Sequence, residues 1–333
     1  MARRARVNLT DVARAAGVSV ATASKALNDA PQVRASTRER VIRCAQALGF
    51  EPRNAASAAV AGVRPIGMVA SDRMGVMAMP VLAGAERYFS SRGVPVFFAN
   101  AYGDPELRNR YVASLVRYGA RGLIIMGDNA NPSEPSADCP VPVVYARRRS
   151  TNPDDFALLH DDRGVGALQV DHLTERGCER VGIVVGDLTR RSANERLRGA
   201  RDRLRELGLS PAFVSVGDTW REEGGRRAVA DAMAQGTAFD GLVCGNDELA
   251  RGALDALRER GVTVPDTVQV IGVDNRETEV RNARPTLTSV DLRLVEMGSL
   301  AAQRLMELIG GAGHRGVERF GGTVVQRSST HSV

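Results

Sequence analysis

Residues 9–28 read Leu-Thr-Asp-Val-Ala-Arg-Ala-Ala-Gly-Val-Ser-Val-Ala-Thr-Ala-Ser-Lys-Ala-Leu-Asn, and this stretch decides the fold of the N-terminal part of the chain. The side chain of Asn8 can cap a first helix, and Gly17 can end it. Ser19 is a suitable cap for a second helix that begins directly afterwards. Small Ala13 lets the two helices pack closely. The spacing is that of a helix-turn-helix.

The charge of the chain is concentrated in this part. Residues 1–64 carry a net charge of +7 and residues 65–333 a net charge of −1, so the overall excess of +6 belongs to the N-terminal segment. The outer face of the second helix is expected to carry short side chains and one cation, the single lysine of the chain: Val20, Ala21, Ser24 and Lys25. Such a face can enter the major groove of DNA. The alternative is a helical hairpin with a solvated positive face.

The rest of the chain alternates between apolar runs and helical patterns. Strands are predicted at Ile66–Ala70, Val94–Ala99, Gly122–Met126, Val141–Tyr145, Val181–Val185, Ala212–Val216, Gly241–Cys244 and Val268–Val273. Helices are predicted near 77–92, 104–118, 163–176, 192–208, 222–236 and 246–261. Short apolar strands separated by helices favour an α/β fold with doubly wound parallel sheets. Some ten strands exceed one comfortable sheet, so we expect two similar lobes.

Several classes of protein and site are disfavoured. No segment approaches the ~20 apolar residues of a membrane helix. The N-terminus lacks the apolar stretch of a signal peptide, so we expect a cytoplasmic protein without a membrane partner. The four cysteines and four histidines are scattered, without the spacing of a metal site or a catalytic pair. Gly164-Val-Gly166 is too short for a dinucleotide-binding motif, and neither a P-loop nor a catalytic triad is present. We therefore expect no enzyme, no cofactor and no metal.

Four motifs of the N-terminal segment resemble the head of the lactose/galactose-repressor (LacI/GalR) family. They are Asp11-Val-Ala-Arg-Ala-Ala-Gly-Val-Ser19, Ala23-Ser-Lys-Ala-Leu-Asn28, Thr37-Arg-Glu-Arg-Val41 and Leu48-Gly-Phe-Glu-Pro52. The remainder resembles the family's two-lobed core of the periplasmic-binding-protein-like type. The resemblance implies a transcriptional regulator, expected to be a repressor, that binds pseudo-palindromic operator DNA as a homodimer.

The expected parts of the chain follow from this resemblance. The helix-turn-helix head is expected at 1–50, and a hinge helix with its linker at 51–64. The core that binds effector and partner subunit is expected at 65–333. Within the core, lobe one is expected to comprise about 65–161 and 293–318, and lobe two about 162–290 and 319–330.

The resemblance also implies roles for individual residues of the head. Positions that match contacts to the DNA backbone are Ser19, Thr22, Ser24, Asn28 and Arg34. Thr10 is a further expected DNA-binding residue. Positions that match base-reading residues are Val20, Ala21 and Lys25. Positions that match the hinge, which in this family enters the minor groove, are Phe50, Arg53, Ala56, Ala59 and Val60.

Two features of the head depart from the family pattern. Ala59 stands where the family has a wedging leucine, so either Ala59 or the neighbouring Val60 is expected to insert between bases. Val20 and Ala21 lack hydrogen-bonding groups, so they can read bases only by apolar contact, for example with thymine methyl groups. The operator sequence and its bend remain open.

Effector-binding residues are expected in the loops that follow the strands of the two lobes. Arg196 with Gly199 resembles an R-x-x-G signature, Asn246-Asp247 resembles the start of N-D-x-x-A-x-G, and Asp274 matches an aspartate after V-I-G-x. By resemblance, Arg196, Asn246 and Asp274 should bind ligand hydroxyls, and Trp220 is a candidate for stacking on a sugar face. The remaining expected contacts are Asp72 and Met74, from the loop after the first strand, and Arg147.

Arg147 departs from the family pattern, which commonly has aspartate there. Two guanidinium groups, Arg147 and Arg196, would favour a carboxylate or phosphate. A sugar acid or sugar phosphate is therefore one hypothesis, a neutral sugar is an equal one, and a third places Arg147 outward. An alternative function is a sugar-binding protein without a DNA role, which the basic head disfavours.

Overall fold

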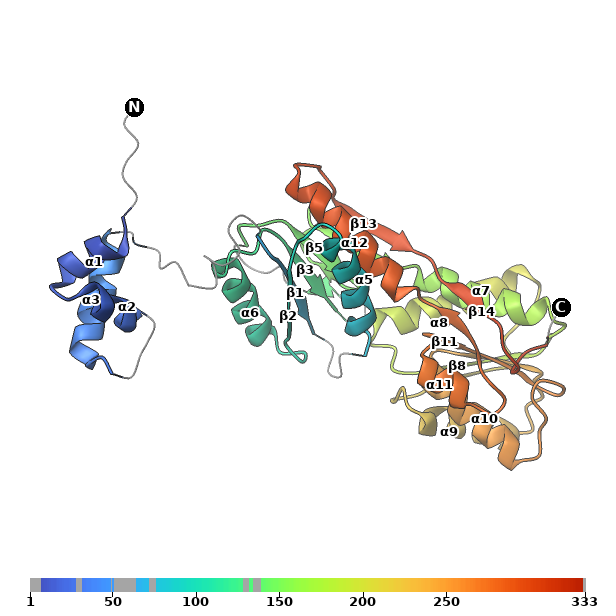
Figure 1. The fold of residues 1–333 in the computed structure, drawn as a ribbon. Helices are drawn as coiled ribbons and strands as arrows, with labels where there is room; N and C mark the ends of the chain where they lie inside the picture. Colours follow the sequence, from blue (N-terminus) through green and yellow to red (C-terminus); the bar gives the residue numbers. More distant parts are fainter. Residues whose placement is uncertain are drawn as a thin grey trace. The chain divides into compact units, whose positions relative to one another are not determined.

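The structure is a computed structural model that describes residues 7–27, 32–48, 50, 64–71, 76–127, 132–133 and 139–331. The chain divides into two compact units, Met1–Gly62 and Val63–Val333. The predicted hinge helix lies almost wholly outside the described residues. Figure 1 shows the fold of each unit.

The N-terminal unit is built from three short helices. They are α1 (Leu9–Ala16), α2 (Val20–Leu27) and α3 (Ala35–Leu48). Small and β-branched side chains of all three helices form its core, among them Val12, Ala13, Ala23, Val41 and Ala45. Side chains this small let the helix axes approach closely. The predicted helix-turn-helix is therefore present.

Local sequence signals set the ends of these helices as predicted. The Asn8 side chain accepts hydrogen bonds from the backbone N–H groups of Thr10 and Asp11, at 2.9 and 3.1 Å. Gly17 ends α1 in the left-handed region at φ 63°, which a glycine adopts without strain. Ser19 Oγ accepts from the backbone N–H of Thr22 at 3.1 Å and so caps α2. These caps fix the turn between the two helices.

The larger unit contains two six-stranded sheets. In the first, the order is β13-β7-β5-β3-β1-β2, and every neighbouring pair is parallel. In the second, the order is β14-β12-β11-β10-β8-β9, with only β14 antiparallel to its neighbour.

The strands of the first sheet are β1 (Ile66–Ala70), β2 (Val96–Asn100), β3 (Leu123–Met126), β5 (Val143–Ala146), β7 (Phe156–His160) and β13 (Gly316–Phe320). Those of the second are β8 (Val181–Val185), β9 (Phe213–Val216), β10 (Gly241–Cys244), β11 (Gln269–Val273), β12 (Thr288–Asp291) and β14 (Thr323–Val325). A short pair, β4 (Pro132–Ser133) with β6 (Arg149–Ser150), completes the strands described.

Helices cover the two sheets, and the pattern is the doubly wound parallel arrangement that the apolar strands predicted. They are α5 (Ala78–Ser90), α6 (Pro105–Arg117), α7 (Asp162–Thr174), α8 (Arg191–Glu206), α9 (Glu222–Ala234), α10 (Asp247–Glu259), α11 (Glu277–Asn282) and α12 (Leu294–Ile309). Figure 1 shows α12, near the end of the chain, beside α5, near the start of the core.

Glycines allow three helix pairs to approach backbone to backbone. A Cβ on Gly199 of α8 would lie 1.9 Å from the Arg163 carbonyl oxygen, and one on Gly166 of α7 would lie 2.1 Å from that of Arg196. The same reciprocal contact joins α9 with α10 and α5 with α12. A side chain at these positions would force the helices apart. This close approach of α7 and α8 matters for the site described below.

The chain crosses between the sheets three times. It passes from β7 to α7 of the second lobe, from β12 back to α12 of the first, and from β13 to β14. Each lobe is therefore made of segments far apart in the sequence. Strands β1, β3, β5 and β7 of the first lobe and β8, β10 and β11 of the second are parallel within their sheets, so each lobe gathers their carboxyl ends at one edge.

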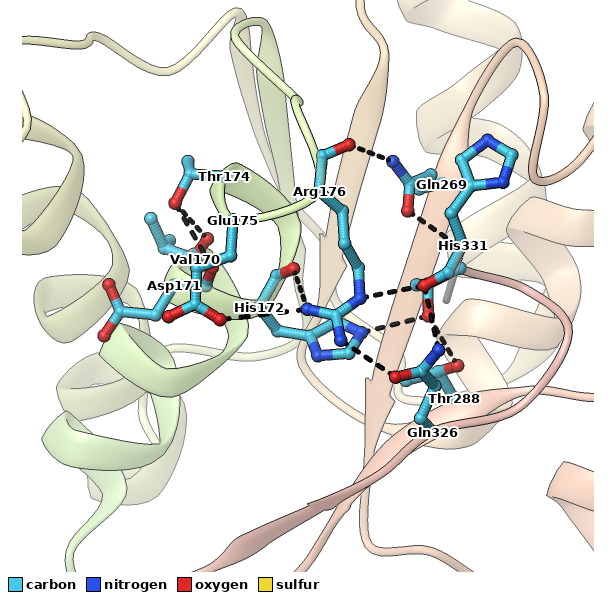
Figure 2. Close-up of polar contacts among 11 residues, drawn as sticks. Val170, Asp171, His172, Thr174, Glu175, Arg176, Gln269, Thr288, Gln326 and His331 are labelled. Atoms are coloured by element: carbon cyan, nitrogen blue, oxygen red, sulfur yellow. Dashed lines mark hydrogen bonds and ion pairs between the residues drawn. The ribbon is translucent and has the colours of Figure 1, made fainter. Parts of the chain in front are cut away.

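The last described residues are held on the second lobe by a polar cluster (Figure 2). His172 Nε2 lies 2.9 Å from Thr330 Oγ1, and Arg176 Nε donates to the His331 carbonyl at 2.9 Å. The side chain of Gln269 donates to the Arg176 carbonyl and accepts from the backbone N–H of His331. Buried polar groups need such partners, so this cluster secures the C-terminal segment.

Candidate functional site

The exposed face of the head lies on α2. Val20 is 44% exposed, and Ala21 and Lys25 are exposed beside it. Ser24 is half-buried. The surface therefore offers short side chains around one ammonium group, a shape that a DNA groove can accept.

The other predicted DNA contacts of the head differ in accessibility. Thr10 and Arg34 are exposed, whereas Thr22 is half-buried and shares a hydrogen bond of 2.8 Å with the Ser19 hydroxyl.

Phe50 is half-buried against the core of the head, and its backbone N–H donates to the Ala45 carbonyl. Phe50 thus anchors the end of the head. The predicted contacts Asn28, Arg53, Ala56, Ala59 and Val60 lie outside the described residues.

In the larger unit, Arg196 is held from two sides. Its Nε donates to Asp162 Oδ1 at 2.9 Å, and its Nη1 donates to the Gly245 carbonyl at 2.8 Å. Asp162 begins α7 and Arg196 lies on α8. Because the glycine contacts bring these two helices close together, the two side chains can form their ion pair. Gly199 of the R-x-x-G signature has this structural role. The guanidinium is placed rigidly at the carboxyl end of the second sheet.

Arg147 occupies the matching edge of the first sheet. It follows β5 directly, has a φ of 58° and is 8% exposed. Its backbone N–H donates to the Leu158 carbonyl on β7 at 2.9 Å, which fixes the turn. A left-handed conformation in a residue other than glycine costs energy, and such residues are frequent at functional sites. Arg147 is buried, so the hypothesis that it points outward is wrong.

Asp274 lies at the carboxyl end of β11, with a φ of 103°. Its backbone N–H donates to the Val290 carbonyl, whereas its carboxylate makes no hydrogen bond with any described residue. Burial raises the pKa of this carboxyl, and the guanidinium groups of Arg196 and Arg147 counteract the rise.

Asn246 and Trp220 are joined to each other. Asn246 Oδ1 caps α10 by accepting from the Leu249 N–H at 2.9 Å, and Nδ2 donates to the Trp220 carbonyl at 3.0 Å. The Trp220 ring packs against Gly186 and Gly245, where added side chains would collide with it. Both the oxygen and the nitrogen of the Asn246 side-chain amide are therefore hydrogen-bonded within the protein. Of the remaining predicted contacts, Asp72 and Met74 lie outside the described residues.

Two buried residues of this region were not predicted as site residues. Asp247 is fully buried and accepts from Ser289 Oγ at 2.6 Å and from the Arg276 N–H at 2.9 Å. Burial, together with the nearby Asp274 carboxylate, raises its pKa well above the usual range. Asp247 thus holds the loop that carries Asp274. The sequence feature that could have identified Asp247 is its place beside Asn246 in the N-D motif.

His160 is the second of these residues. It ends β7, is 5% exposed, and has both ring nitrogens buried without a hydrogen bond of standard geometry to a described residue. Burial lowers its pKa well below the ordinary value, and Arg147 and Arg196 lower it further, against a smaller opposing effect of the Phe320 carbonyl. The ring is therefore uncharged at neutral pH. No sequence pattern marked this position.

The described part of the chain contains no group of His, Cys, Asp and Glu side chains arranged to hold a metal ion. None of its helices combines the length and apolar character needed to cross a membrane.

Known families and proteins match both units. A family described as "Bacterial regulatory proteins, lacI family" matches residues 8–53, and one described as "Periplasmic binding protein-like domain" matches residues 170–330. The HTH-type transcriptional regulator GalR of Salmonella typhimurium (strain LT2) is 29% identical over 308 residues, which cover 91% of this chain and 89% of that protein. The HTH-type transcriptional repressor PurR of Aliivibrio salmonicida is 26% identical over 98% of this chain and 99% of its own length.

Solved structures show the same fold. A lac repressor bound to ONPG in the repressed state has 25% sequence identity and a TM-score of 0.71, covering 98% of this chain and 100% of its own. These relatives carry the names of transcriptional regulators. The predicted fold and the predicted resemblance are confirmed: the chain combines a helix-turn-helix domain that matches the lacI family of bacterial regulatory proteins with a periplasmic-binding-protein-like core.

Proposed function

We propose that this regulator is a repressor of a carbohydrate or sugar-acid catabolic operon, and that a small-molecule effector controls its affinity for operator DNA. The observation that supports the proposal is the presence, in one chain, of a helix-turn-helix whose second helix is exposed and of a two-lobed core that holds one buried arginine in each lobe, Arg147 and Arg196. The role is binding and not catalysis, and it is performed in the cytoplasm, where the operator lies.

The head supplies the DNA contacts. Lys25 can donate to guanine O6 or N7 or to a phosphate, and Val20 and Ala21 can touch thymine methyl groups. Exposed Thr10 and Arg34 are suited to phosphate contacts that set the register. We therefore expect the head to recognise each half of the operator mainly through apolar contacts and one cation. The hinge residues remain part of the proposal by resemblance.

The core supplies the effector site. Arg196 and Asp274 approach the ligand from lobe two, and Arg147 from lobe one. Trp220 and Asn246 shape the wall of lobe two, and Asp72 and Met74 stay in the proposed contact set by resemblance. A ligand that contacts both lobes stabilises one relative arrangement of them, so binding in the core can shift the affinity of the heads for DNA.

The proposed assembly is a homodimer, and the structure offers a surface for it. Strand β2 is an edge of the first sheet, and its side chains Phe97 and Phe98 are 45% and 38% exposed. Exposed aromatic side chains on an edge strand favour association, and a second copy would cover them. Two heads related by a two-fold axis match a pseudo-palindromic operator.

A salt-titrated mobility-shift assay on promoter fragments near the gene tests the proposal. We expect one fragment to bind at ~10⁻⁸ M or tighter at physiological salt, on the order of 10³-fold more tightly than a scrambled duplex. The affinity should fall steeply as salt is raised, because phosphate contacts release counterions. Equal affinity for every sequence would refute the proposed role.

A further inference from the structure

Three residues with strained backbone conformations lie close to the end of β12. In the described part of the chain, five residues other than glycine have a positive φ, and three of them are Asp274, Asn275 and Arg293, at 103°, 49° and 52°. Asp274 and Asn275 form the turn after β11 of lobe two, and Arg293 stands directly before α12 of lobe one. Residues in such conformations keep them only while their surroundings hold them, and they are frequent in segments that switch between two arrangements.

The carboxylate of Asp291, at the end of β12, joins these strained residues. Its Oδ1 accepts from the backbone N–H of Arg293 at 2.6 Å, and its Oδ2 accepts from Asn275 Nδ2 at 3.1 Å. Asn275 is held from two further sides, because its backbone N–H donates to Ser289 Oγ at 3.0 Å and its Oδ1 accepts from Arg327 Nη2 at 2.7 Å. A single carboxylate therefore links the turn after β11 to the start of α12.

Arg293 extends this link to the other two crossings between the lobes. Its guanidinium lies over the ring of Phe320, 5.0 Å from the ring centroid, and also 3.8 Å from Glu296 on the surface of α12. The Phe320 ring is a neighbour of the His160 ring, with 6.5 Å between the centroids. The Phe320 carbonyl accepts from the Asp161 N–H at 3.0 Å. All three crossings are thus in contact at their lobe-one ends.

The backbone of Asp291 is fixed on the side of lobe two. Asp291 is paired with Thr323 where β12 and β14 run antiparallel. A Cβ on Gly322 would lie 3.1 Å from the Asp291 carbonyl oxygen and 2.7 Å from Val290 Cγ1, so the two strands approach backbone to backbone there. The part of Asp291 that reaches toward lobe one is therefore its carboxylate.

We propose that Asp291 is a positioning residue that couples the Asp274–Asn275 turn of lobe two to the start of α12 in lobe one, and that Arg293 and Phe320 carry this coupling to the other crossings. Because the Asp291 backbone is held in β12, a displacement of the turn rotates the carboxylate through Oδ2 and weakens the hydrogen bond of Oδ1 to Arg293. The coupling is a property of the core, whereas its use in the control of DNA binding rests on the proposed function.

Hydrogen exchange of the full-length protein, measured by mass spectrometry, tests the coupling in Asn275→Gly. A glycine adopts a φ of 49° without strain, so the variant loses the side-chain hydrogen bonds and keeps the turn. We expect the N–H groups of Arg293 and Met297, which donate to Asp291 and to the Arg293 carbonyl, to exchange about tenfold faster. Unchanged exchange at these two groups, or an equal rise throughout both lobes, would overturn the inference.

Two further variants test whether the effect passes through Asp291. Asp291→Ala should speed exchange at the start of α12, and adding Asn275→Gly should then have no further effect there, because the link is already broken. Additive effects would contradict the proposal.

The matched control is Asp104→Ala, which removes a carboxylate that accepts from the N–H groups of Glu106 and Leu107 at the start of α6 in lobe one. This variant should speed exchange in α6 alone. An equal rise at the start of α12 in the control would show that the loss of any helix cap in lobe one reaches α12, and the proposal would fall.

The affinity of Asn275→Gly for operator DNA, measured by fluorescence anisotropy, separates the coupling from the proposed function. If exchange at the start of α12 rises and operator affinity stays the same, the coupling stands and the proposed control of DNA binding loses its support. If exchange does not respond, the coupling is refuted and the proposed function is unaffected.

Discussion

The head and the core hold their functional residues in opposite ways. In the head, Val20, Ala21 and Lys25 are exposed and make few contacts within the protein. In the core, Arg147, Arg196 and Asn246 are buried, and hydrogen bonds to carbonyls and carboxylates hold the last two. Changes in the reading helix should therefore alter binding at constant stability, whereas changes in the core should alter both.

The largest expected effect is the loss of stability in Asp247→Ala. The substitution leaves Ser289 Oγ and the Arg276 N–H without their acceptor, at about 1–3 kcal/mol each. Asp247→Asn is the matched control, because its amide oxygen can accept from Arg276 and its Nδ2 can donate to Ser289. Since the raised pKa already favours an uncharged carboxyl, the asparagine variant should retain most of the stability. Urea unfolding of the two variants measures the difference, and equal losses would contradict the role of Asp247.

The pH dependence of stability should differ in His172→Gln. The pKa of His172 is lowered from 6.5 to about 4 by burial and by Arg176, so between pH 6.5 and 4 the unfolded chain binds more protons than the folded one. Stability should fall as the pH drops through this window, by about 2 kcal/mol at pH 5 from this residue.

Glutamine can keep the hydrogen bond that His172 shares with Thr330 Oγ1, and it does not titrate. Thermal unfolding at pH 7.5 and pH 5 should therefore give the variant a smaller loss than the parent. His160 titrates in both proteins and cancels in the comparison. Identical pH profiles would show that His172 is not the responsible group.

In the head, Lys25→Ala should weaken operator binding without changing stability. Lys25 is exposed and α2 keeps its core residues, so the melting temperature should stay the same. Loss of one base or phosphate contact costs roughly 1–2 kcal/mol, about tenfold in affinity. Fluorescence anisotropy with operator DNA and differential scanning calorimetry measure the two quantities. A large drop in melting temperature would show that Lys25 contributes to the stability of the head.

Lys25→Arg should have the smallest effect and bears on base preference alone. Both side chains are cationic, but a planar fork and a flexible point charge select different acceptor geometries. We expect an altered preference at one operator position and less than about 1 kcal/mol of change in overall affinity. Selection from a randomised operator library measures it. An unchanged preference would mean that the single lysine of the chain has no special role.

The sequence predicted the local structure of the head well. The ends of α1 and α2 depend on side chains within three residues, such as Asn8, Gly17 and Ser19, so they can be identified from neighbouring residues. The apolar strands from Ile66 to Val273 were also evident, because both faces of a parallel sheet are buried. The pattern was less informative at β13 and β14, whose residues are only partly buried.

The candidate site in the core could be predicted only in part. Motif spacing pointed to Arg196, Asn246 and Asp274, but their partners come from distant segments. Asp162 reaches Arg196 through the packing of two helices, and His160 is buried at the end of β7 only in the folded core. Neither feature can be predicted from neighbouring residues in the sequence. The departure at Arg147 was visible in the sequence, whereas its burial is a property of the fold.

Control of the head by ligand binding in the core is measured through the affinity of the full-length protein for its operator, by fluorescence anisotropy, without effector and with the effector site saturated. We expect this affinity to change by about 5- to 150-fold, the usual range for coupled sites, and we expect Asp274→Asn to reduce the change. An operator affinity that is the same in both conditions would contradict this expectation.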